Sequence, residues 1–71
     1  MKRRNTTAIR FGKTVREYRK SAGFSLPTLG ERSGISKGLL SEMEHGRGNP
    51  SLLTIHKLAR ALYVTPGDLL A

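Results

Sequence analysis

Cysteine is absent from this 71-residue chain, so neither a disulfide framework nor a thiolate metal site can stabilise it. Long apolar runs are absent too, since none approaches the roughly 18 residues that a membrane-spanning helix needs. The basic start, residues 1–5, has no apolar segment behind it, and we therefore expect no secretory signal. These absences predict one small cytoplasmic domain whose stability comes from the packing of a single core.

Acidic residues are scarce: five Asp and Glu stand against 13 Lys and Arg, which leaves a net charge of +8. The imbalance is concentrated at the start, where residues 1–20 hold eight basic residues and one acid, Glu17. So large a charge on a small domain favours a polyanionic partner. Nucleic acid, an anionic membrane surface and an acidic protein all fit the charge, and nucleic acid is the interpretation that we favour.

Groups for catalysis or metal binding are also few. His45 and His56 are the only histidines, and neither lies at ligand spacing from a carboxylate cluster. No nucleophile, base and orienting residue form a recognisable set, and the glycines at 46 and 48 do not have the spacing of a phosphate-binding loop. We expect neither enzyme activity, nor a cofactor, nor a metal.

What the sequence does contain is a series of short amphipathic helices with no competing strand pattern. Residues 1–6 are predicted to be a flexible basic arm and residues 7–71 the domain. Helices are expected at about 7–22, 26–33, 37–45 and 51–62, with a last short one from Pro66. One apolar stripe in the first helix comprises Ala8, Phe11, Val15, Tyr18 and Ala22, and one in the fourth comprises Leu52, Ile55, Leu58, Ala59 and Leu62. The apolar residues of the second helix are Leu26 and Leu29, those expected to point inward at the third are Ile35, Leu40 and Met43, and Leu69 and Leu70 follow Pro66 in the last.

Capping residues mark the predicted boundaries. Ser25, Ser36 and Thr65 are suited to begin helices, because their hydroxyl oxygens can accept a free N–H of the first turn. Gly23 and Gly46 are suited to end them.

The stretch from Ser25 to Gly46 carries the most information. Two helices there are joined by only a few residues, and a crossing so close needs a small residue where the second helix packs, which Gly30 supplies. Gly34 supplies the turn residue that tolerates a positive φ. Leu40 is placed to bring an aliphatic side chain into the shared core. A small residue, a glycine and an aliphatic residue at offsets 0, 4 and 10 predict a helix-turn-helix.

In these segments the chain resembles the Xre/Cro-type, phage-repressor-like DNA-binding domains. The resemblance covers about residues 9–70 and rests on Gly12-x-x-Val15-Arg16-x-Tyr18-Arg19, Gly23-Phe24-Ser25, Ser33-Gly34-Ile35-Ser36, Leu40-Ser41-x-Met43-Glu44-x-Gly46 and Asn49-Pro50-Ser51-Leu52. It implies an all-α, five-helix, lambda-repressor-like fold and sequence-specific binding of double-stranded DNA, usually as a homodimer at palindromic sites. Residues 36–45 would then enter the major groove.

Geometry and this resemblance together suggest the DNA contacts. The predicted base-reading positions are Lys37, Gly38, Ser41 and Glu42, on the outward face of the third helix. Lys37 could donate to guanine and Glu42 could accept from cytosine, whereas Gly38 either permits close backbone approach or leaves a base step unread. The predicted phosphate contacts are Ser25, Ser36, Arg47, Asn49, Arg10 and Arg19. Lys2, Arg3 and Arg4 of the arm could add charge.

Two further features come from the comparison with that family. Arg19 is expected to pair with Glu44, which would tie the third helix to the first. A glutamine that touches phosphate often follows Ser25 in the family, but here the residue is Leu26, and Pro27 removes a backbone donor beside it. The phosphate contact at this helix start is therefore in doubt, and Leu26 is as well explained by local packing.

The leading hypothesis is a transcriptional repressor that binds DNA as a dimer and associates with the nucleoid. The alternative is an antitoxin or accessory module whose main partner is a protein. The residues considered for a protein surface, or for the dimer contact, are Leu26, Leu39, Tyr63, Leu69 and Leu70.

Overall fold

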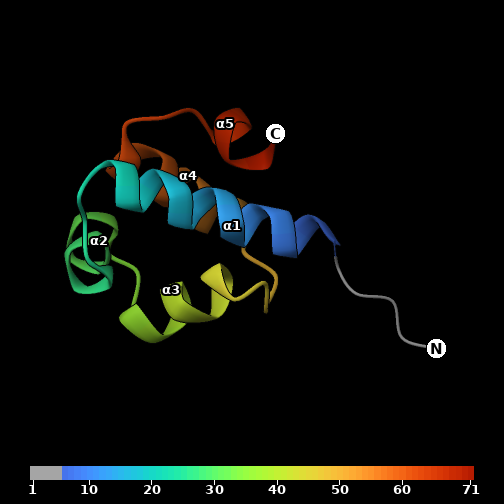
Figure 1. Ribbon diagram of the computed structural model, residues 1–71, viewed down its shortest axis with the longest axis horizontal. Helices are drawn as coiled ribbons and strands as arrows, with labels where there is room; N and C mark the ends of the chain where they lie inside the picture. Colours follow the sequence, from blue (N-terminus) through green and yellow to red (C-terminus); the bar gives the residue numbers. More distant parts are fainter. Residues whose placement is uncertain (1–5) are drawn as a thin grey trace.

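The computed structural model describes residues 6–71, which form five α-helices joined by short loops and contain no strand (Figure 1). The predicted all-α class and element order are confirmed. The helices are α1 (Thr6–Ser21), α2 (Leu26–Ser33), α3 (Lys37–Glu44), α4 (Leu52–Leu62) and α5 (Pro66–Leu70). None of them is long and apolar enough to cross a membrane. The predicted arm contacts of Lys2, Arg3 and Arg4 lie outside the described residues.

Side-chain caps explain where α2 to α5 begin. The hydroxyl oxygens of Ser25, Ser36, Ser51 and Thr65 each accept the backbone N–H three residues on, at about 3.1 Å. These bonds satisfy donors that the first turn of a helix leaves without partners. The caps predicted at Ser25, Ser36 and Thr65 are confirmed. Ser51, which was predicted to be the first residue of its helix, is its cap instead.

The core is formed where the helical stripes meet, with α1 running between α3 on one side and α4 and α5 on the other (Figure 1). Most residues of the predicted stripes are buried, whereas Tyr18 and Leu26 are partly buried. Ala22 lies just beyond the end of α1 and is exposed, and Leu52, the first residue of α4, is 84% exposed. In α5 only Leu69 is buried, whereas Leu70 is half exposed.

The crossing of α2 and α3 follows the predicted steric pattern. A Cβ on Gly30 would lie 2.9 Å from the carbonyl oxygen of Ile35, which is too close for any larger residue without movement. Gly34 has φ +75°, in the left-handed region, and its N–H donates to the Gly30 carbonyl at 2.8 Å. Leu40 is fully buried beside Gly30. The three residues therefore fix how α3 leaves the turn.

A second close contact holds α3 against α1. A Cβ on Gly12 would fall on the carbonyl oxygen of Met43, so only glycine lets the two backbones approach to this distance. Met43 is itself buried at the same crossing. Because α3 is held by α2 at one end and by α1 at the other, its outward face is presented in one orientation, along the lower edge of the molecule in Figure 1.

Candidate nucleic-acid interface

The outward face of α3 carries the side chains that the sequence predicted to read bases. Lys37, Gly38 and Glu42 are exposed and Ser41 is half-buried, whereas Leu40 and Met43 on the opposite face are buried. Lys37 has no acidic partner among the described residues. The helix therefore presents a free cation in its first turn and a hydroxyl and a carboxylate one turn later.

Gly38 differs from the glycines of the helix crossings, because its place in the fold does not require it. A Cβ added there would meet nothing within 4 Å, and its φ lies outside the left-handed region. A glycine inside a helix is less favourable than alanine by roughly 0.5–1 kcal/mol. Packing within this chain does not explain the residue, and close approach of a ligand to the α3 backbone is one of the two roles predicted for it.

Glu42 and Arg47, predicted to touch a base and a phosphate respectively, are paired with each other. The Arg47 Nη1 lies 2.9 Å from the Glu42 Oε2, and both side chains are more than half exposed. The backbone is tied in the same place, since the Arg47 N–H donates to the Glu42 carbonyl at 3.0 Å beside Gly46, which has φ +76°. An exposed ion pair is worth only about 0–1 kcal/mol, so it can exchange for contacts with a ligand.

Arg19 and Glu44 form the ion pair expected between α1 and α3. The Arg19 Nε and Nη2 donate to the two Glu44 carboxylate oxygens at 2.7 and 2.9 Å, and Nη1 donates to the Phe24 carbonyl at 2.9 Å. The side chains are 12% and 5% exposed. The hydrogen bonds to Glu44 raise the pKa of Arg19 above its ordinary value, although partial burial opposes this. Arg19 therefore stays charged, and its hydrogen bonds to Glu44 join α3 to α1.

The hydrogen bonds of Arg19 within the chain reduce the number of donors that it could offer to a phosphate. A guanidinium has five N–H donors, and three of them are used within the chain. The remaining two belong to a side chain that is mostly covered. Its structural role is visible in these contacts, whereas its role toward phosphate stays a prediction.

The other predicted phosphate contacts lie at helix starts and in the loop after α3. The Ser36 hydroxyl accepts from Leu39 N–H and donates to no described residue, whereas the Ser25 hydroxyl donates to the Thr28 Oγ1 at 2.9 Å. Ser36 therefore has a free donor that Ser25 lacks. Asn49 and Arg10 are exposed, Asn49 in the loop that precedes α4 and Arg10 on α1.

Leu26, where the family often has a glutamine, is half-buried and packs against the core. The packing interpretation of this residue is confirmed.

The surface predicted for a protein partner or a dimer is only partly present, because Leu69 is fully buried while Leu39, Tyr63 and Leu70 are exposed. Leu52 and Leu53, at the start of α4, add to the exposed apolar residues.

Three features of the site escaped prediction. The Glu42–Arg47 pair depends on how the chain turns after α3, and the contact of Gly12 with Met43 depends on the crossing angle of two helices. The third is a basic groove between α2 and α4, lined in part by Arg32 and Arg60. Gly12 belongs to a family motif, but the sequence carries no separate signal for its close contact. Among residues 6–71, no three His, Asp or Glu side chains gather as a metal site would require.

Comparison with known proteins agrees with the fold and defines its class. The chain is 38% identical to the restriction-modification controller protein C.AhdI from Aeromonas hydrophila, whose crystal structure superposes with a TM-score of 0.87 over 90% of this chain and 97% of that one. The structure of the biofilm master regulator SinR in complex with DNA superposes with a TM-score of 0.82 at 35% identity, over 86% of this chain and 98% of that one.

The sequence relatives are regulators of the same kind. An uncharacterised HTH-type transcriptional regulator from Methanothermobacter thermautotrophicus is 42% identical over 48 residues, which are 68% of this chain and 70% of that protein. SinR from Bacillus subtilis is 37% identical over 60 residues, 83% of this chain, and these span about half (54%) of SinR. The family model for the helix-turn-helix domain matches residues 10–71, and the chain belongs to this family. It is a family of transcriptional regulators rather than of enzymes.

Proposed function

We propose that this chain is a sequence-specific regulator of transcription that binds double-stranded DNA, most simply as a repressor. The observation that carries the proposal is the construction of α3, which is buried on one face against α1 and α2 and presents Lys37, Ser41 and Glu42 on the other. A helix held in this way can enter the major groove, which is wide enough to admit it. The likeness to SinR, whose structure was solved with DNA, supports this use of the fold.

Each residue of the interface has a role in this proposal. Lys37 donates to the O6 and N7 of a guanine, Glu42 accepts from a cytosine N4, and Gly38 lets the helix backbone lie close to the base edges. Ser36, Arg47 and Asn49 hold phosphates on either side of the groove, and Arg10, Arg19 and Ser25 add to these contacts. Arg47 exchanges its bond to Glu42 for a phosphate oxygen when Glu42 turns to its base.

The same proposal includes a homodimer on a near-palindromic operator. Leu52 and Leu53 are exposed at the start of α4, and exposed Leu70 of α5 lines a small hollow of about 130 Å³ together with Asn49 and Pro50 of the loop before α4. Apolar side chains that this chain leaves uncovered are suited to a self-complementary contact. To fit such an operator, the two-fold contact has to place the two α3 helices one turn of DNA apart, about 34 Å.

The test is selection of bound duplexes from a random pool. We expect an enriched motif with two half-sites separated by one helical turn. Lys37→Ala and Glu42→Ala should each relax the preference at one position of each half-site, at a cost of about 1–3 kcal/mol for the matched site. Lys13→Ala, which removes a charge from the exposed surface of α1, is the control and should leave the motif unchanged.

Two outcomes would contradict the proposal. Enrichment of no motif would exclude operator recognition, and an unaltered motif from both α3 variants would exclude the assigned base contacts. Measuring the affinity at several salt concentrations adds a second check. A variant that loses one phosphate contact should show a plot of log affinity against log salt whose slope is shallower by about 0.9.

A further inference from the structure

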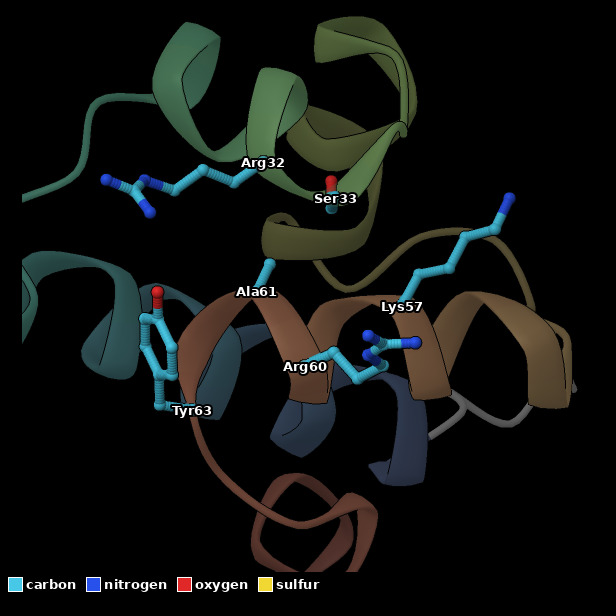
Figure 2. A pocket seen from close by; sticks show the side chains of 6 residues that line it. All are labelled: Arg32, Ser33, Lys57, Arg60, Ala61 and Tyr63. Atoms are coloured by element: carbon cyan, nitrogen blue, oxygen red, sulfur yellow. The ribbon is translucent and has the colours of Figure 1, made fainter.

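A hollow of about 570 Å³ lies between α2 and α4, away from the outward face of α3. Six residues line it: Arg32, Ser33, Lys57, Arg60, Ala61 and Tyr63. We refer to it as the basic groove. Figure 2 shows the small side chains of Ser33 and Ala61 facing the space between the helices. In that view Lys57 lies at one end, Arg60 in the middle, and Arg32 and Tyr63 at the other end.

The three cations of the basic groove have no acidic partner. Arg32, Lys57 and Arg60 are exposed, and the ion pairs of residues 6–71 involve other side chains. Arg32 lies over the ring of Phe24, 4.5 Å from its centroid, and this contact leaves its N–H donors available. Three like charges around one hollow repel each other unless an anion is present.

Tyr63 adds a second unusual feature. It is the one non-glycine residue with a positive φ in residues 6–71 (58°), at the end of α4, where glycine would be less strained. Its side chain is 81% exposed, so the ring gains little packing within the chain. Its phenol group stands toward α2 on the side of Arg32 in Figure 2, where it can act as a further hydrogen-bond donor.

The shape and charge of the basic groove restrict what it can hold. A DNA duplex and a membrane surface are too broad to enter a space between two helices. A second copy of this chain has only five acidic residues among 13 basic ones, and Glu42 and Glu44 are already paired with arginines, so it offers no acidic segment to this groove. Extended acidic chains are the class of ligand that remains for the basic groove. A single nucleic-acid strand is held by stacking of successive bases on several aromatic rings, and this groove has one, Tyr63, since Phe24 is already covered by Arg32.

We propose that the basic groove between α2 and α4 binds an acidic, extended segment of a partner protein, through Arg32, Lys57 and Arg60 with Tyr63 at one end. The carboxylates of the segment accept from the two guanidinium groups, whose planar forks match carboxylate geometry, and from the Lys57 ammonium. Because these residues come from α2 and α4, the partner can be bound while α3 is in contact with DNA. The proposal does not depend on the DNA-binding function.

The test uses fluorescence anisotropy with a labelled peptide of about eight residues, half of them aspartate, at about 0.15 M salt, where long-range attraction is screened. Arg60→Glu should weaken binding about tenfold, because one ion pair is lost and a repulsive charge takes its place. Arg16→Glu, the same charge change on the exposed surface of α1, is the matched control and should weaken binding less than about twofold. Both variants should keep the melting temperature of the parent chain.

Amide chemical shifts locate the peptide in the same experiment. We expect the largest changes at Ser33, Ala61 and Tyr63. Changes centred on Lys37 and Ser41, or equal effects of the two charge reversals, would overturn the proposal by showing general attraction to a basic protein. Tighter binding of a single-stranded oligothymidine than of the peptide would overturn it in favour of nucleic acid.

Discussion

On the inner face of α3 every position takes part in a contact, whereas the outer face of the same helix has open space around it. Leu40 and Met43 are buried, and the Glu44 carboxylate accepts two bonds from Arg19. On the outside, within the described part of the chain, Lys37 has no acidic partner, a Cβ on Gly38 would meet nothing within 4 Å, and the Glu42 carboxylate is held only by an exposed pair. The difference shows that the fold determines where α3 lies, while the outer side chains remain free for a ligand.

The largest effect is expected from the inner face. Glu44→Ala should lower the free energy of unfolding by roughly 3 kcal/mol, because it leaves the mostly buried Arg19 charge without its carboxylate. For a domain of this size the melting temperature should fall by more than about 10 °C. Glu42→Ala, the corresponding change on the outer face, is the control and should alter it little. An unchanged melting temperature for Glu44→Ala would contradict the scaffold role of the pair.

Gly12, which packs against the inner face of α3, and Gly38, on its outer face, allow the same substitution to be compared on both sides of this helix. Gly12→Ala should destabilise the chain by about 1–3 kcal/mol, because its methyl group meets the Met43 carbonyl and α1 and α3 must move apart. Gly38→Ala should stabilise it by roughly 0.5–1 kcal/mol, because alanine favours the helix and nothing blocks its Cβ. Urea unfolding of both variants measures these changes in the free energy of unfolding. A lower stability of Gly38→Ala than of the parent chain would show that the outer face is constrained by packing.

The smallest effect is expected at the Glu42–Arg47 pair. A double-mutant cycle with alanine at both positions should give a coupling of less than about 1 kcal/mol in thermal unfolding, since both side chains are exposed. In binding to the selected duplex, the same cycle should show a different coupling, because each residue takes a separate DNA partner. Equal coupling energies in the two measurements would mean that the pair persists in the complex.

Much of this molecule follows from local sequence signals. The caps at Ser25, Ser36 and Thr65, and the glycines at 30 and 34 with Leu40, predicted helix positions and the α2–α3 crossing because their effects act within a few residues. The errors were at Ala22 and Leu52, which are exposed, at Leu69, which is buried, and at Ser51, which caps its helix instead of beginning it. A stripe shows which residues share a face, but it does not show whether another helix extends far enough to cover them.

The candidate interface also has one part that the sequence predicts and another that it does not. That Lys37, Gly38 and Glu42 face outward could be predicted, because helical periodicity separates them from Leu40 and Met43. The partner of Glu42 could not, because Arg47 reaches it only after the turn at Gly46. The basic groove could not be predicted either. Arg32 and Arg60 are far apart in the chain, and they line the same groove only because α2 packs against α4.

The sequence by itself determined five helices, the caps of three of them, and the steric pattern that joins α2 to α3, because these depend on backbone preferences and on spacing along the chain. The tertiary structure decided which charges are paired, which leucines are covered, and where three cations gather without a partner. These outcomes depend on distances between helices, and such distances are set by the packing of the whole core.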